Sequence, residues 1–170
     1  MNICGINYES FADGEGIRAA IFVSGCSKKC PGCHNAEAQN KNLGSKLDKE
    51  LFNQICSEIR KRPFLSGITL TGGDPFESYN IGESAKLIHD LKIEFPQLSI
   101  WVYTGELFED IKETNYYALC NIDVLVDGRF ILNKKDRTLQ FKGSSNQRII
   151  DVQKTLEKGV IVEWKSIKDF

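Results

Sequence analysis

The stretch Ser24-Gly25-Cys26-Ser27-Lys28-Lys29-Cys30-Pro31-Gly32-Cys33-His34-Asn35 places three of the chain's six cysteines in the spacing C-x3-C-x2-C. Closely spaced thiolates of this kind are typical of a metal or iron–sulfur site rather than of a disulfide. Three thiolates can hold a four-iron cluster and leave one iron open. An open metal position can bind and activate a small molecule, as it does in catalytic zinc sites. The stretch therefore predicts an iron–sulfur site with an open coordination position.

Two simpler interpretations of this stretch remain open. One is a zinc site with His34 as the fourth ligand, although a histidine directly after Cys33 rarely reaches the same tetrahedral centre. The other is a set of three unrelated buried thiols. Pro31 and Gly32 favour the cluster, because a loop with these residues can wrap closely around it and direct backbone N–H groups toward its sulfurs.

The composition limits the class of protein. The chain has 170 residues, which we expect to form a single domain over residues 1–170. Its 22 Lys and Arg against 23 Asp and Glu give a net charge of -1. This balance gives no excess of basic residues of the kind that binds nucleic acid or a membrane surface. No apolar run of about 18 residues is present, and residues 1–5 lack the features of a signal peptide. We therefore expect a cytoplasmic protein with reduced thiols and with no nucleic-acid or membrane partner.

Short apolar runs alternate with helical patterns along the chain. Strands are predicted at 17–23, 67–70, 98–103, 122–126, 138–141 and 160–164, and helices follow a capping box of Ser45 and Asp48, at 81–95, at 107–120 and at 149–156. This alternation is typical of a parallel sheet with helices packed against it. Because a closed eight-fold barrel needs about 250 residues, the expected fold class is α/β. We expect an open partial (β/α) TIM-like barrel of about five to six mainly parallel strands.

Polar or glycine-rich loops follow five of the predicted elements. They are Cys26–Asn35, Gly72–Asp74, Thr104–Gly105, Asp127–Gly128 and Gly143–Gln147. In parallel α/β folds, ligands bind at the edge where strands end. These loops therefore predict one shared site.

The loop Gly72-Gly73-Asp74-Pro75 adds a second chemical signal. Paired glycines let a ligand approach the backbone, and Asp74 can accept hydrogen bonds from an ammonium group. An ordinary turn between a strand and a helix would also use such residues.

These motifs together resemble the radical S-adenosylmethionine (SAM) superfamily. The superfamily carries three cysteines spaced like Cys26, Cys30 and Cys33, followed by a motif similar to 72–75. The sequence motifs at 13–18 and 33–35 resemble those of activases of glycyl-radical enzymes. The motifs at 100–105, 124–130 and 143–147 are similar to those of one branch, the activating proteins of anaerobic ribonucleoside-triphosphate reductase. The resemblance extends from about Asn7 to Arg148, and it leaves the tail 151–170 unmatched.

Two positions depart from the usual superfamily pattern. Asp74 stands where most members have Glu, and Gly32 stands where many have an aromatic residue. The shorter carboxylate can serve the same purpose, and the reductase activases tolerate the glycine, so the second departure favours the narrower branch.

The resemblance implies a mechanism and a set of site residues. Cys26, Cys30 and Cys33 would hold a [4Fe-4S] cluster whose open iron is chelated by SAM. The remaining cofactor-binding positions would be Gly32 and His34 beside the adenine, Gly72, Gly73 and Asp74 around the methionine ammonium, and Asp127 and Asn146 as further contacts. The reduced cluster would cleave SAM to a 5′-deoxyadenosyl radical, which takes hydrogen from a glycine of the large reductase subunit, so no side chain need act as an acid or base. The resemblance further implies a low-potential electron donor such as flavodoxin.

Three other functions remain as alternatives. A pyruvate formate-lyase type activating enzyme shares the motifs at 13–18 and 33–35, and a 7-carboxy-7-deazaguanine synthase shares a small partial barrel. A non-catalytic iron–sulfur electron carrier is the third, although carriers usually close the cluster with a fourth cysteine.

Cys4, Cys56 and Cys120 form no second cluster by spacing, and Arg18 is expected to support the sheet rather than a substrate. We expect the partner's glycine loop to enter through the open side of the partial barrel.

Overall fold

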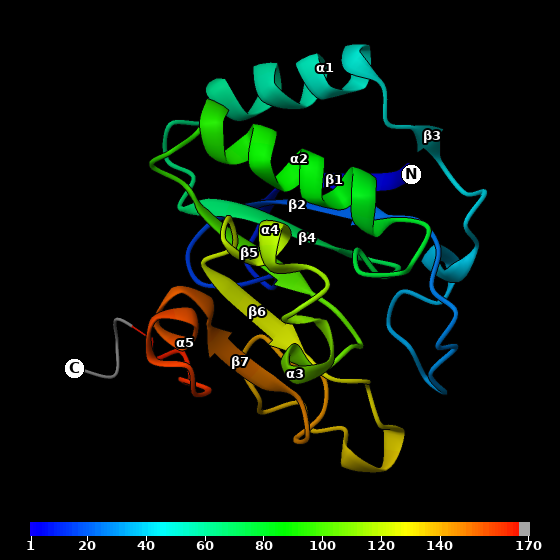
Figure 1. The fold of residues 1–170 in the computed structure, drawn as a ribbon. Helices are drawn as coiled ribbons and strands as arrows, with labels where there is room; N and C mark the ends of the chain where they lie inside the picture. Colours follow the sequence, from blue (N-terminus) through cyan, green and yellow to red (C-terminus); the bar gives the residue numbers. More distant parts are fainter. Residues whose placement is uncertain (167–170) are drawn as a thin grey trace.

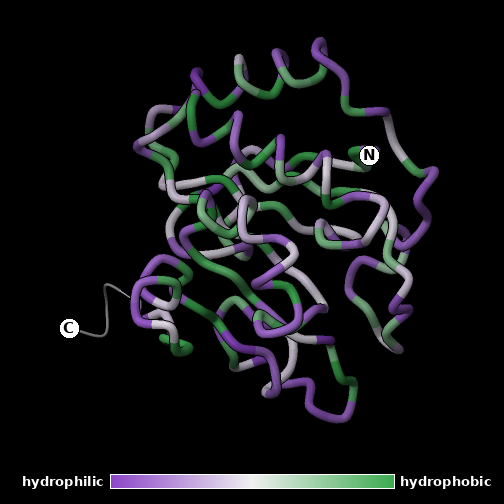
Figure 2. Tube along the Cα trace, in the orientation of Figure 1, coloured by the Kyte–Doolittle hydropathy of each residue, from purple (hydrophilic) through white to green (hydrophobic). Residues whose placement is uncertain are grey.

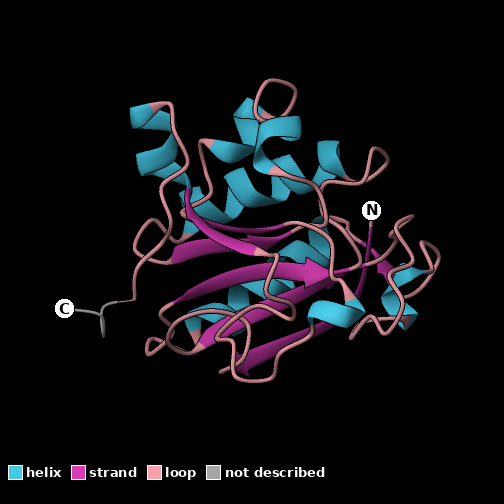
Figure 3. Cartoon of the chain, turned by 90° about the horizontal axis from the view of Figure 1, so that it is seen from below, coloured by secondary structure: helices cyan, strands magenta, loops and turns pink. Residues whose placement is uncertain are grey.

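The structure is a computed structural model that describes residues 1–166, and these residues form one seven-stranded sheet in the order β3-β1-β2-β4-β5-β6-β7 (Figure 1). The four central strands β2 (Arg18–Val23), β4 (Gly67–Gly72), β5 (Ser99–Tyr103) and β6 (Val124–Asp127) are parallel. The outer strands β1 (Asn2–Ser10), β3 (Ser45–Lys46) and β7 (Arg148–Asp151) pair antiparallel. Figure 3 shows the strands side by side in a single open sheet.

The expected fold is confirmed as α/β with a mostly parallel centre. Because β3 and β7 are the edges and do not pair with each other, the sheet is not a closed barrel. Three of the seven strands are antiparallel, which differs from the expectation of five to six mainly parallel strands. The strand β1 was missed because its residues alternate poorly between apolar and polar, and most of them are only partly buried.

The longer helices pack on one face of the sheet. These are α1 (Lys49–Arg60) and α2 (Ile81–Glu94), which bury Ile55, Leu87 and Ile88 against apolar strand residues in the main core. Figure 2 shows hydrophobic residues along the central strands and alternating with hydrophilic ones on both helices. Shorter helical segments are η1 (Glu37–Gln39), α3 (Phe108–Ile111), α4 (Tyr116–Leu119), η2 (Leu132–Lys134) and α5 (Val152–Lys158). None of the helices in residues 1–166 is long and apolar enough to cross a membrane.

A smaller apolar cluster involves strands β5 and β6. Trp101 and Val126 are buried there, and the rings of Phe141 and Trp164 pack edge-on against Trp101 with centroids 5.5 Å and 5.0 Å away. Arg18 lies 5.2 Å from the centre of the Trp101 ring and donates hydrogen bonds to Thr69 Oγ1 and the Ser99 carbonyl. Arg18 therefore supports the sheet, as expected.

Two predicted strands are wrong. Residues 138–141 form a loop, and Phe141 has a φ of 56°, a left-handed conformation that a non-glycine residue does not adopt in a regular strand. Residues 160–164 make only an isolated bridge from Glu163 to Ile150, so they lie along β7 without forming a strand.

Three helix predictions also need correction. The segment 107–120 breaks into α3 and α4, with a turn at 112–115 that contains Thr114 and Asn115, two poor helix formers. The helix expected at 149–156 begins only at Val152, because the preceding residues pair with β6 as β7. The capping box is replaced by a single cap, since Asp48 itself accepts the Leu51 N–H and Ser45 lies in β3.

Candidate functional site

A cavity of about 420 Å³ opens where the parallel strands end. Its lining combines the cysteine loop after β2 with the loops after β4, β5 and β6. Of the predicted site residues, the structure places eight around this cavity: Cys26, Cys30, Gly32, Cys33, His34, Gly72, Gly73 and Asp74. The prediction that the loops share one site therefore agrees with the geometry for these positions.

The three cysteines of the loop are free thiols, each partly buried. The loop turns tightly: the Cys33 N–H donates to the Cys30 carbonyl at 3.1 Å, and Gly32 has a φ of 71°. Burial raises the pKa of the Cys26 thiol. Within residues 1–166, no three His, Cys, Asp or Glu side chains form a group that could hold one metal ion. A four-iron cluster binds each thiolate through a different iron, and three free thiols on one cavity lining match that requirement.

The paired glycines bring two loops into backbone contact. The Gly73 N–H donates to the Val23 carbonyl at 2.7 Å, and the Asp74 N–H donates to the Gly25 carbonyl at 2.8 Å. A Cβ atom on Gly73 would lie 2.4 Å from the Gly25 oxygen, so only glycine fits. Close packing of the loop after β4 on the cysteine loop thus accounts for Gly73.

Asp74 is buried and fully hydrogen-bonded. Its Oδ1 accepts from the Thr104 hydroxyl at 2.8 Å and from the Phe76 N–H at 2.9 Å, while its Oδ2 accepts from the Gly105 N–H at 2.9 Å. Lys28 Nζ forms an ion pair with the same Oδ2 at 2.9 Å. The carboxylate that was expected to receive a ligand's ammonium group therefore already holds a lysine ammonium group.

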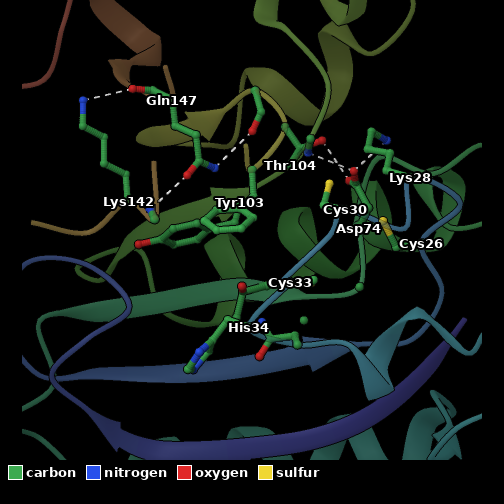
Figure 4. A pocket seen from close by; sticks show the side chains of 18 of the residues that line it. Cys26, Lys28, Cys30, Cys33, His34, Asp74, Tyr103, Thr104, Lys142 and Gln147 are labelled. Carbon is green, nitrogen blue, oxygen red and sulfur yellow. Dashed lines mark hydrogen bonds and ion pairs between the residues drawn. The ribbon is translucent and has the colours of Figure 1, made fainter. Parts of the chain in front are cut away.

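Lys28, which the sequence interpretation missed, connects three loops. Its Nζ lies 2.7 Å from Glu106 Oε1 and 3.7 Å from Glu77 Oε1, in addition to Asp74. Burial disfavours the lysine charge, but Asp74 and Glu106 more than offset this effect and raise the pKa of Lys28. Figure 4 shows Lys28 and Asp74 beside Cys26 and Cys30. No motif marks Lys28 in the sequence, because its carboxylate partners lie 46 or more positions away.

The opposite wall of the cavity is built from β5 and the segment after β6 (Figure 4). The Tyr103 hydroxyl donates to the Phe141 carbonyl at 2.8 Å, and burial raises the pKa of Tyr103. Gln147 accepts from the Gly143 N–H at 2.9 Å and donates to the Gly128 carbonyl at 3.0 Å. Lys142 donates to the Gln147 carbonyl at 3.0 Å. Gln147 therefore holds this wall together.

The structure does not bring Asp127 or Asn146 to the cavity lining. Asp127 is buried, and it accepts hydrogen bonds from Arg148 Nε and from the Phe108 N–H, both at 2.9 Å. The Asn146 amide donates to the Arg129 carbonyl at 2.8 Å, and its Oδ1 is buried with no partner in the described residues. Both side chains face the protein's own loops.

Comparisons with known proteins agree with the cysteine chemistry. A family model described as a 4Fe-4S single cluster domain matches residues 12–150. The chain is 36% identical over 148 residues to the anaerobic ribonucleoside-triphosphate reductase-activating protein of Escherichia coli K12, which covers 84% of this chain and 96% of that protein. The chain belongs to this family of activating proteins.

Other members of the activating-protein family match equally broadly. The protein of the same name from phage T4 is 37% identical over 139 residues, which is 82% of this chain and 86% of that protein. The Vibrio cholerae protein is 33% identical over 150 residues, with 85% and 97% coverage. The resemblance seen in the sequence motifs is therefore confirmed at the level of the family.

Proposed function

We propose that this activating protein is an iron–sulfur enzyme that cleaves SAM reductively and generates the glycyl radical of anaerobic ribonucleoside-triphosphate reductase. The observation that carries the proposal is the cavity, in which three free thiols of the cysteine loop face the loop of Asp74. The names of its relatives support the choice of reductase.

Cys26, Cys30 and Cys33 fit a [4Fe-4S] cluster and would each bind one iron. The fit rests on three free thiols at one cavity with no other cysteine lining it among residues 1–166. When bound, the cluster supplies the electron that splits SAM into methionine and the 5′-deoxyadenosyl radical, the species that removes hydrogen from a glycine Cα. The remaining task of the chain is to orient and shield the ligand.

The charge around Lys28 supports an ammonium site in this cavity. Three carboxylates, those of Asp74, Glu77 and Glu106, surround a single lysine ammonium group. This group of side chains therefore keeps an excess of negative charge, which attracts a second cation such as the methionine ammonium. Asp74 can share its Oδ2 between the two cations or lose Lys28 to the partly exposed Glu106.

Gly32 and His34 lie on the cavity lining next to the cysteines and are available to the adenine, as proposed from the motif. The pocket is also lined by Tyr103, whose hydroxyl is turned to the Phe141 carbonyl. Because that hydrogen bond fixes the O–H group on the protein backbone, Tyr103 presents its ring rather than its hydroxyl hydrogen to a ligand. Asp127 and Asn146 act in this proposal by fixing the loops around the cavity.

The test uses anaerobically reconstituted protein reduced with dithionite and mixed with SAM and a candidate anaerobic reductase. We expect 5′-deoxyadenosine, methionine and a glycyl-radical EPR doublet on the reductase. Cys30→Ala should bind less iron and lose all three products. Cys120→Ala is the matched control, because Cys120 is an exposed free thiol outside the cavity, and it should behave as the wild type.

Each failure has its own meaning. SAM cleavage without the doublet would reject the reductase as substrate and favour a pyruvate formate-lyase type activase or a 7-carboxy-7-deazaguanine synthase. No cleavage by protein with a full iron–sulfur content would reject the enzyme and favour an electron carrier. Replacement of dithionite by flavodoxin then tests the proposed low-potential donor.

A further inference from the structure

The segment between β6 and β7 concentrates positive charge. Residues 129–142, here called the basic loop, contain five basic side chains against the single acid Asp136 (basic: Arg129, Lys134, Lys135, Arg137 and Lys142). The loop therefore carries a charge of +4 (five minus one), whereas the whole chain carries -1. The nearly neutral net charge of the chain therefore does not show the local excess of positive charge in the basic loop.

The charges of the basic loop are not neutralised by the protein itself. Within residues 1–166, none of its five basic side chains forms an ion pair, and Asp136 instead accepts hydrogen bonds from the N–H and hydroxyl of Thr138. Several basic residues on the helices do form ion pairs, for example Arg60 with Glu94 and Lys154 with Asp151. Four of these cations are exposed and Lys142 is partly buried. Exposed cations without ion-pair partners attract an acidic surface over several ångströms.

The basic loop also forms part of the cavity wall. Lys135, Leu139 and Lys142 line the cavity, and the Arg129 guanidinium donates to the Lys28 carbonyl in the cysteine loop at 2.7 Å. Leu132 approaches the cysteine loop so closely that a Cβ on Gly32 would lie 2.9 Å from its Cδ1. A molecule seated on the basic loop would therefore lie beside the cavity.

The outer part of the basic loop projects from the body of the protein (Figure 1), and it combines hydrophilic and hydrophobic residues (Figure 2). Ile131 and Leu132 are 40% and 48% exposed, next to the exposed Lys134 and Arg137. Aliphatic side chains rimmed by charges are typical of protein interfaces. A nucleic-acid surface would combine the cations with exposed aromatic rings for stacking, and within the described part of this loop both phenylalanines are partly buried.

We propose that the basic loop docks an acidic segment of the protein substrate and holds it at the cavity mouth. This inference rests on the proposed function, because a glycine in a protein must be brought to the cavity by a larger surface. Lys134 and Arg137 provide the long-range attraction, and Ile131 and Leu132 provide the apolar contact.

The experiment reverses charges that do not line the cavity. Lys134→Glu/Arg137→Glu is compared with Lys134→Arg/Arg137→Lys and with a distant control, Lys49→Glu/Lys158→Glu, whose lysines are also exposed and form no ion pair within residues 1–166. Dithionite is the reductant in the SAM-cleavage and binding assays, and reduction of each variant by a flavodoxin is measured separately. We expect partner-free SAM cleavage to be unchanged in all variants, and reductase affinity at about 50 mM salt to fall about tenfold only in the first. The loss should shrink at about 300 mM salt, because screening weakens the attraction.

The outcomes separate this inference from the proposed function. If the wild type cleaves SAM and activates the reductase but the first variant binds the reductase as tightly, the docking role is wrong and the function stands. If the first variant keeps its reductase affinity and loses only reduction by a flavodoxin, the basic loop serves the electron donor and the inference is overturned. If the wild type fails to bind or activate the reductase, the proposed function itself is wrong.

Discussion

At the residue scale, the site depends on a lysine that no motif identifies. The glycine-rich loop indicates Asp74 in the sequence, and Asp74 lies on the cavity lining. Its main cationic partner, Lys28, lies between two cysteines and meets Asp74 only when the loops after β2 and β4 come together. Sequence spacing cannot show such a contact, because Lys28 and Asp74 are far apart in the chain. They meet because the parallel strands β2 and β4, which precede their loops, pair side by side.

Replacement of Lys28 by methionine tests this ion pair. Lys28→Met keeps most of the side-chain volume and leaves the buried Asp74 without its ammonium partner. We expect the free energy of unfolding of the cluster-free protein to fall by about 2 kcal/mol, less than for a fully buried pair because Glu106 is partly exposed. Urea unfolding measures the change, and Lys28→Arg is the control that keeps the charge. Equal stability of Lys28→Met and wild type would show that the ion pair contributes nothing.

A second ion pair near β7 predicts a pH dependence. Hydrogen bonds from Arg148 lower the pKa of Glu109 to about 2. Because the folded pKa lies below the unfolded one, the pair stabilises the fold above the ordinary glutamate pKa and loses this effect as the pH falls through the range down to about 2. The contribution should be below about 1 kcal/mol, since the Glu109 side chain is half exposed.

Glu109→Gln is the variant that isolates this effect. Its stability should fall less steeply than that of the wild type between about pH 5 and pH 2. Thermal unfolding followed by circular dichroism at a series of pH values measures both slopes. Parallel slopes would contradict the prediction.

At the element scale, the buried elements were predictable and the edges were not. The strands β2, β4, β5 and β6 are rich in apolar residues and mostly buried, and each was located within two residues at either end. The errors lie where tertiary contacts override local pattern. The sequence predicts Phe141 in a strand, but the residue has a left-handed conformation and its ring packs against Trp101. Residues 149–151 pair with β6, although their pattern predicts the start of a helix.

The start of α1 provides a test of this kind of error. The sequence predicts a capping box with Ser45 as the cap, whereas in the structure Asp48 accepts the Leu51 N–H at 2.9 Å. Asp48→Ala should therefore lower the free energy of unfolding by about 1 kcal/mol, and Ser45→Ala should change it by no more than a few tenths. Chemical denaturation of the two variants measures this difference. If Ser45→Ala lowered the free energy of unfolding more than Asp48→Ala, the capping box with Ser45 as the cap would be supported instead.

At the scale of the whole molecule, the sequence predicts that the polar loops meet at one edge of the sheet, and the structure shows which segments form the walls of the cavity there. The order of strand and loop was enough to bring the cysteines and the glycine-rich loop together, because the ends of parallel strands share one edge. The segment that forms the opposite wall, 139–147, was placed only in part, because the loop Gly143–Gln147 was expected at this edge whereas residues 138–141 were assigned to a strand. It is held by contacts with β5 and with Trp164, which come from distant parts of the chain.

The aromatic cluster predicts a long-range effect on the cavity. Trp164 packs edge-on against Trp101 and Phe141, with ring centroids 5.0 Å and 6.2 Å away, and Phe141 accepts the hydrogen bond of the cavity residue Tyr103. Trp164→Ala should destabilise the protein by about 2 kcal/mol, less than a fully buried tryptophan would, because Trp164 is partly buried. It should also speed hydrogen exchange in residues 139–147. Trp164→Phe retains a ring and should change both quantities much less. Exchange that increases only beside residue 164 would show that the cluster does not hold the cavity wall, since the loss of packing would then stop at the segment that carries the substitution.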